Sequence, residues 1–182
     1  MEWLIGLAIV VVIGAFVIST YNELVTLRNK VKNSLAQIDA QLQRRFDLIP
    51  NLVETVKGFA AHEKSLLENV TASRSAYMNA GSSKEKFAMN QELTSSLKSL
   101  FVVAENYPEL KANVNFLKLQ EALAEAEEDV AYARQFYNDS VTIYNNKLLV
   151  FPSNLVGKIF GFKEEALFDA AEEAESVPKV QF

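Results

Sequence analysis

Residues 3–21, WLIGLAIVVVIGAFVISTY, run for nineteen positions without a charged side chain, and the rest of the chain is patterned as amphipathic helix. At 1.5 Å per residue a helix of this length spans about 28 Å, close to the hydrocarbon thickness of a bilayer. We therefore expect residues 1–21 to form an N-terminal transmembrane anchor. A cleaved signal peptide is the alternative, but only Met1 and Glu2 precede the run, and it has no basic n-region.

The flanks of the apolar run predict its orientation. Trp3 and Tyr21 bracket the run as interfacial anchors. Nothing basic precedes it, whereas Arg28, Lys30 and Lys32 follow it closely. Because positive flanks stay in the cytoplasm, we expect the N-terminus outside and the following domain on the cytoplasmic side.

Beyond the anchor, apolar residues recur at alternating steps of three and four, which is typical of packed helices. The chain of 182 residues has only six glycines and four prolines. The pattern predicts helices near 4–46, 49–79, 83–107 and 111–149. Since short links make neighbouring helices antiparallel, we expect an all-α fold in which the transmembrane helix continues into an antiparallel up-down four-helix bundle over residues 22–150.

The first link, Asp47–Pro50, is the least certain boundary because it contains no glycine. A turn is favoured, with Asp47 as a cap and Pro50 in the first turn of the next helix. The alternative is one long helix kinked at Pro50.

Composition argues against an enzyme. The chain has no cysteine, one histidine and a net charge of −5, which excludes thiolate chemistry and gives no general attraction to nucleic acid. No Gly-rich phosphate loop, nucleophile elbow or HExxH motif occurs. His62 fits a packed or surface residue, and the acidic run at 125–129 fits a solvated face. We expect no catalytic residue, cofactor or metal.

A second membrane contact is expected near the anchor. Antiparallel helices bring basic residues to the membrane-facing end, where anionic lipid attracts them: Arg28, Lys30, Lys32, Lys84, Lys86 and Lys158. The stretch FPSNLVGKIFGF (151–162) adds Phe151, Phe160 and Phe162. Residues 151–168 then form an amphipathic segment that lies in the headgroup layer or plugs the bundle end. An acidic, flexible tail is expected over 169–182.

Two blocks carry more polar residues than helix packing requires, and we expect them to bind partners. The block QLQRRFDLIPNLVETVKGFAAHE (41–63) supplies candidates at the tip of the bundle: Arg44, Arg45, Asp47, Pro50 and Asn51. The block ARQFYNDSVTIYNNKLLVFPSN (133–154) supplies a second set: Arg134, Tyr137, Asn138, Asn145 and Asn146. Asparagine is a mediocre helix former, so each placement needs a reason. Within the apolar seams, as at Asn90, fixing the helix register is the favoured reason.

Three stretches closely resemble the LemA family: YNELVTLRNKVKNSLAQIDAQLQRRFDLIPNLVETVKGFAAHE (21–63), ENYPELKAN (105–113) and YNDSVTIYNNKLLVFPSNLVGKIFGF (137–162). The resemblance implies a single-span protein of the bacterial cytoplasmic (inner) membrane with an antiparallel helical-bundle domain. It assigns no catalytic residue. It also implies an association with membrane organisation, since LemA-like domains occur in magnetosome membrane proteins, and with membrane proteases, whose genes often neighbour LemA genes.

From these patterns we expect a membrane-anchored, non-enzymatic scaffold that self-associates and organises envelope proteins or membrane. The alternative is an adaptor or regulatory subunit of a membrane protease or stress-response complex, with the RRFD segment as its docking site. The expected partners are membrane lipid, further copies of the chain and other membrane proteins, and not nucleic acid.

Overall fold

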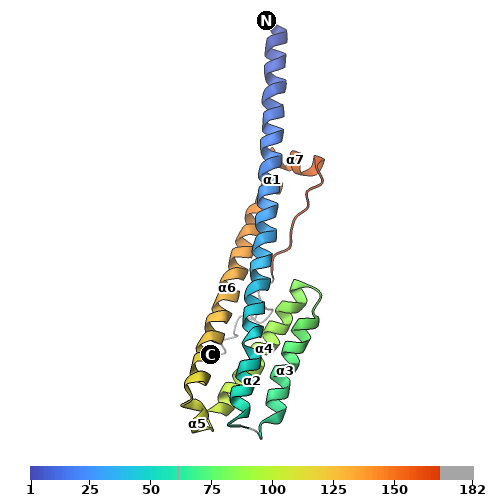
Figure 1. The fold of residues 1–182 in the computed structure, drawn as a ribbon. Coiled ribbons are helices and arrows are strands. Elements are labelled where there is room, and N and C mark those ends of the chain that lie inside the picture. Colours follow the sequence, from blue (N-terminus) through green and yellow to red (C-terminus); the bar gives the residue numbers. More distant parts are fainter. Residues whose placement is uncertain (61, 169–182) are drawn as a thin grey trace, which may run out of the picture. The chain divides into compact units, whose positions relative to one another are not determined.

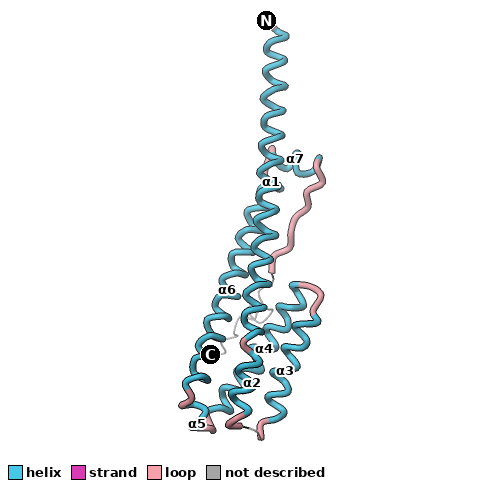
Figure 2. The backbone as a smooth tube through the Cα atoms, in the orientation of Figure 1, coloured by secondary structure: helices cyan, strands magenta, loops and turns pink. Residues whose placement is uncertain are grey.

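The computed structural model describes residues 1–60 and 62–168, and every regular element in these ranges is an α-helix (Figure 1, Figure 2). The helices in chain order are α1 (Glu2–Asp47), α2 (Ile49–Lys57), α3 (Lys64–Asn79), α4 (Ser83–Ala104), α5 (Pro108–Lys111), α6 (Val114–Leu149) and α7 (Ser153–Ile159). The all-α fold with an apolar N-terminal helix is therefore confirmed.

Contacts between residues divide the chain into two compact units. The anchor unit contains residues 1–34 and the described residues from 134 onward, and the core unit contains residues 35–133. Helices α1 and α6 each contribute residues to both units. The domain boundaries at residues 21, 150 and 168 stay predictions, and the acidic tail at 169–182 lies outside the described residues.

The turn predicted at Asp47–Pro50 is wrong. Leu48 alone separates α1 from α2, and its backbone keeps helical dihedrals of φ −76° and ψ −21°. The N–H of Leu52 donates to the C=O of Leu48 at 3.2 Å, so helical bonding resumes at once. Pro50 lies in the first turn of α2, where its missing N–H costs little. The alternative was one long helix kinked at Pro50, and the structure has a helical run that extends from Glu2 to Lys57.

The chain reverses direction later, between Lys57 and Lys64, so the single helix predicted over 49–79 is also wrong. Gly58 ends α2, as expected for a residue with poor helix propensity. The C=O of Glu63 then accepts the N–H groups of Leu66 and Leu67, both at 3.2 Å, and α3 begins. Helix α3 packs against α2 and against α4 within the core unit (Figure 1).

The later boundaries lie close to those predicted. Helix α4 begins with a capping box, in which the N–H of Glu85 donates to Ser82 Oγ and the carboxylate of Glu85 accepts the N–H of Ser82, both at 3.2 Å. Asn113 caps α6 by accepting the N–H groups of Asn115 and Phe116 at 2.9 and 3.1 Å. Both caps satisfy N–H groups that a helix start leaves without partners.

Most of the fully buried core lies on the predicted apolar seams, to which Phe46, Leu110 and Val141 are added. The fully buried members of the core unit include Ile38, Leu42, Phe46, Ile49, Leu52, Val70, Leu93, Leu100 and Leu110. In the anchor unit, Leu24, Val141 and Tyr144 are fully buried. Burial on this scale contributes about 1.5–3 kcal/mol for each large apolar side chain.

Candidate functional site

The apolar start of α1 is exposed rather than packed. Trp3 is 93% exposed and Val12 is 67% exposed, and only 6% of the most apolar 18-residue window is buried. Within the described residues, one helix is long and apolar enough to cross a membrane by length and composition. Because a soluble core helix would be buried, the exposure fits the predicted membrane anchor.

Helix α7 is seated against the end of this apolar stretch. A Cβ at Gly157 would lie 2.7 Å from Leu148 Cδ2 and 4.0 Å from Leu24 Cδ1, so glycine permits a close approach to α6 and α1. Val156 is buried beside it. On the opposite side, Ile159 is 75% exposed. Helix α7 therefore buries one side and leaves apolar side chains exposed, and we define its exposed apolar face as Leu155, Ile159 and the following Phe160.

Several predicted membrane-contact residues meet in one small cavity. The Tyr21 ring lies 4.8 Å from the ring of Phe160 and 5.7 Å from that of Phe162. The cavity has a volume of about 240 Å³ and is lined by Tyr21, Val25, Arg28, Asn29, Lys32, Phe160, Gly161 and Phe162. This headgroup cavity, as we call it, combines two cations with three aromatic rings directly after the apolar stretch.

The other predicted membrane contacts do not line this cavity. Lys30 Nζ lies 5.3 Å from the centre of the Phe136 ring, and Phe151 and Lys158 are exposed. Lys86 Nζ pairs with Asp39 Oδ2 at 3.8 Å in the core unit. The side chain of Lys84 lies outside the description.

Two Tyr-Asn pairs on α6 bind the chain's own extended segment 163–168. Asn145 makes two hydrogen bonds to the main chain of Glu165: Nδ2 donates to the C=O at 2.8 Å and Oδ1 accepts from the N–H at 3.0 Å. Asn138 does the same to Phe168, at 3.2 and 2.9 Å. We call Tyr137, Asn138, Tyr144 and Asn145 the Tyr-Asn ladder, and residues 163–168 the strap.

The two tyrosines complete the ladder. The Tyr144 hydroxyl donates to the C=O of Lys163 and the Tyr137 hydroxyl donates to the C=O of Ala166, both at 2.9 Å. Burial raises the pKa of both phenols. The Glu165 carboxylate raises the pKa of Tyr137 further, whereas at Tyr144 the charge of Arg28 opposes the rise and Glu165 adds to it, so each hydroxyl keeps the proton that it donates.

The spacing of the ladder explains its fit. Its two Tyr-Asn pairs are seven residues apart on α6, and their targets on the strap are three residues apart. Seven helical residues rise about 10.5 Å, and three extended residues span about 10 Å. A heptad on a helix therefore matches three residues of an extended chain, here running antiparallel to α6.

Two further contacts depend on particular side chains of the strap. The Phe168 ring meets the Tyr137 ring edge-on at 5.2 Å. Arg28 Nε lies 4.0 Å from Glu165 Oε1. Both contacts involve side chains of the strap, whereas the hydrogen bonds of the ladder involve only main-chain atoms of the strap.

Sequence reasoning selected Tyr137, Asn138 and Asn145 as partner-binding residues, but it missed the strap that they contact in this structure. The signal was the repeat Y-N-x₅-Y-N at 137–145, followed by a short segment without helical periodicity. Asn146 is exposed and lines a different groove, beside Phe16. Arg134 is partly buried.

The RRFD segment is built into the core unit. Arg45 is only 3% exposed. Its Nη1 donates to Asn90 Oδ1, forms an ion pair with Glu127, and donates to Thr94 Oγ1 at 3.1 Å. Burial lowers the pKa of Arg45, and the Glu127 carboxylate opposes that shift. An arginine this buried offers a partner little surface.

Its neighbour Arg44 is half exposed and pairs with the acidic run of α6, with Nη1 2.7 Å from Asp129 Oδ2 and Nη2 3.5 Å from Glu125 Oε2. Part of the expected solvated acidic face is therefore an ion-pair partner of the two arginines. Asp47 accepts a hydrogen bond from Gln43 Nε2 at 2.8 Å, and Pro50 and Asn51 are exposed.

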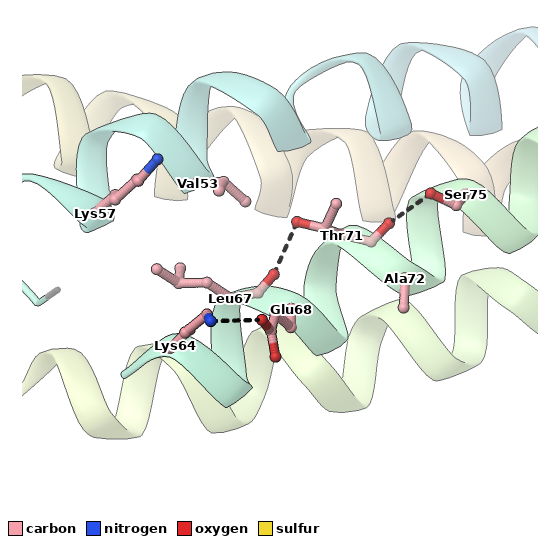
Figure 3. A pocket seen from close by; sticks show the side chains of 8 residues that line it. All are labelled: Val53, Lys57, Lys64, Leu67, Glu68, Thr71, Ala72 and Ser75. Atoms are coloured by element: carbon pink, nitrogen blue, oxygen red, sulfur yellow. Dashed lines mark hydrogen bonds and ion pairs between the residues drawn. The ribbon is translucent and has the colours of Figure 1, made fainter. Parts of the chain in front are cut away.

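A groove of about 560 Å³ lies between α2 and α3, and none of the predicted site residues lines it (Figure 3). Its lining is Val53, Lys57, Lys64, Leu67, Glu68, Thr71, Ala72 and Ser75. Lys64 and Glu68 form an ion pair at 3.7 Å on one side of it (Figure 3).

No cluster of three or more potential metal ligands occurs among the described residues.

Comparison with known proteins agrees with this combination of an apolar N-terminal helix and an all-helical domain. The family model described as the LemA family matches residues 34–182. The chain belongs to the LemA family. Protein LemA of Metamycoplasma hominis is 26% identical over 152 residues, which cover 83% of this chain and 69% of that protein.

Proteins named as magnetosome proteins are also similar to this chain. Magnetosome protein MamQ 2 of Paramagnetospirillum magneticum is 24% identical, over 87% of this chain and 68% of its own length. Magnetosome protein MamQ of Magnetospirillum gryphiswaldense is 22% identical, over 81% of this chain and 64% of its own length.

Proposed function

We propose that this protein is a membrane-anchored, non-enzymatic scaffold that self-associates and organises envelope proteins or membrane. The observation that carries the proposal is the arrangement within the anchor unit. The exposed apolar start of α1, the exposed apolar face of α7 and the headgroup cavity follow one another along the same unit. Together they give the protein a spanning segment and a second, interfacial contact.

Lipid is the first partner of this scaffold. Helix α7 lies in the headgroup layer with Ile159 and Phe160 among the acyl chains. Arg28 and Lys32 face anionic headgroups, and each cation near such a surface contributes about 1 kcal/mol. By the positive-inside rule, the domain lies on the cytoplasmic side of the bacterial inner membrane.

The core unit supplies the protein-binding surface. We propose that the core unit is an antiparallel up-down four-helix bundle. In this bundle the buried Arg45 fixes the helix register through its contacts with Asn90 and Glu127. The relatives named as magnetosome proteins support a role in membrane organisation. The α2–α3 groove favours one alternative, an adaptor that docks a membrane protease or stress-response complex there.

The membrane contact is tested by fluorescence on full-length protein in vesicles with anionic lipid. The chain has no cysteine, so Ile159→Cys takes a single environment-sensitive label. Lipid-borne quenchers are expected to quench this label, and to leave the same label at Glu121→Cys in the core unit unquenched. Equal, weak quenching at both positions contradicts an interfacial α7.

Self-association is tested by expressing two differently tagged full-length copies together. Recovery of both tags from detergent-solubilised membranes supports the scaffold. Recovery of one tag without the other contradicts it.

A further inference from the structure

We propose that the strap exchanges between copies, so that residues 163–168 of one chain bind the Tyr-Asn ladder of a second chain. This inference rests on the proposed self-association and gives it a mechanism. Exchange of an identical element is a low-cost route to association, because every contact made within one chain is remade between two.

The ladder recognises a main chain rather than a particular side chain. Its hydrogen bonds all involve strap main-chain atoms: the C=O groups of Lys163, Glu165, Ala166 and Phe168 and the N–H groups of Glu165 and Phe168. An extended segment of any chain fits this pattern. The Arg28–Glu165 pair and the Phe168 ring restrict the choice to an acidic residue followed three positions later by an aromatic one, which a second copy supplies.

The strap buries little in its own chain. Lys163, Glu164, Ala166 and Leu167 are all exposed, and Leu167 keeps 51% of its surface in solvent. Segments with few buried apolar contacts open at low free energy, well below that of global unfolding. The ladder can therefore release its own strap while the helices stay folded.

A hinge precedes the strap. Gly161 has a φ of +70°, which glycine adopts without strain, and the N–H of Phe162 donates to the C=O of Gly157 at 3.0 Å to close α7. A change of dihedrals at Gly161 breaks this hydrogen bond and redirects Phe162 and the strap, while the helical residues of α7 stay in place. Anchoring in one membrane also raises the effective concentration of neighbouring copies, which favours pairing between chains.

The test uses two full-length variants of the chain. One has an intact strap and a disabled ladder, and the other has an intact ladder and a disabled strap. The strap copy carries Asn138→Ala and Asn145→Ala, with Phe168 replaced by the photo-crosslinker p-benzoylphenylalanine. The ladder copy carries Glu165→Pro and Phe168→Pro, which remove the two N–H groups that the asparagines accept. On irradiation of membranes that contain both, we expect a crosslinked dimer joined near Tyr137 of the ladder copy.

The matched control adds Asn138→Ala and Asn145→Ala to the ladder copy and is expected to reduce the dimer at least tenfold. A dimer that survives this control, or no dimer at all, overturns the exchange. Co-recovery of two tagged wild-type copies separates the causes: if they copurify without strap crosslinking, only the exchange fails. If they do not copurify, the self-association proposal fails with it.

Discussion

The side-chain amide of Asn145 forms hydrogen bonds with both main-chain polar groups of Glu165, donating to its C=O at 2.8 Å and accepting from its N–H at 3.0 Å. A side-chain amide paired in this way imitates the edge of a β-strand on the surface of a helix. The second pair, Asn138 with Phe168, repeats the arrangement one heptad earlier. Residues that resemble an open binding surface in the sequence are thus occupied by the chain's own strap.

Removing the Asn145 amide is expected to free the strap locally. Two hydrogen bonds of about 1 kcal/mol each protect this point, so Asn145→Ala should accelerate exchange of the Glu165 amide hydrogen at least about tenfold. Asn146→Ala, which alters the adjacent exposed residue, is the control and should leave that rate unchanged. Hydrogen exchange with mass spectrometry measures both, and equal rates in the two variants would contradict the ladder.

The two neighbouring arginines should differ in their effect on stability. Arg45→Met breaks a buried pair and leaves Asn90 without its donor, which costs about 3 kcal/mol of the free energy of unfolding. Arg44→Met breaks a half-exposed pair and costs about 0.5 kcal/mol. Denaturant unfolding followed by circular dichroism compares the two variants. Similar losses would mean that Arg45 does not organise the core unit.

We expect the folded protein to lose stability at alkaline pH because of Tyr77. Its ring stacks on Phe46 at 3.9 Å, and burial, with the charges of Asp39 and Asp47, raises the pKa of Tyr77 from 10.0 to about 12. The folded state therefore holds the phenolic proton more tightly than the unfolded state does. This contribution to stability is complete below pH 10.0 and is lost as the pH rises through about 12.

The matched variant for this prediction is Tyr77→Phe, which has no proton to lose. Its free energy of unfolding should fall less than that of the wild type between about pH 9 and about pH 11. Denaturant titrations at the two pH values measure the difference, and identical losses would show that Tyr77 ionises freely in the folded protein.

Much of the core could be predicted from the sequence because apolar steps of three and four map directly onto buried helix faces. The same periodicity misplaced the first turn. It continues across Gly58–Glu63, so it does not register the break there, and Pro50 was given more weight than Gly58 although proline is tolerated in a first turn. A single glycine was the better signal for the turn.

Sequence patterns selected some of the residues that the structure brings together, and their roles stay predictions. Five residues that were selected as membrane contacts line one cavity, because the chain after α7 returns to residues 21–32 of α1: Tyr21, Arg28, Lys32, Phe160 and Phe162. The targets of the Tyr-Asn ladder escaped prediction because they are main-chain atoms, which carry no signature in residue types. The burial of Arg45 escaped for a related reason: it depends on tertiary pairing with Glu127 and Asn90.

Sidedness is testable with one label. If the domain is cytoplasmic as proposed, the membrane of intact spheroplasts keeps an impermeant maleimide from the cysteine of Glu121→Cys. Full labelling is then expected only after lysis. The absence of other cysteines makes the signal specific. Full labelling before lysis would place the domain outside and reverse the proposed orientation.

The central claim is that copies of this chain assemble on the membrane, and crosslinking in living cells tests it most directly. Full-length tagged protein is crosslinked, purified in detergent, and everything trapped is identified by mass spectrometry. The account predicts crosslinks mainly between copies of this chain. A recurrent second protein joined to the α2–α3 groove, without crosslinks between copies, would contradict the scaffold and establish the adaptor in its place.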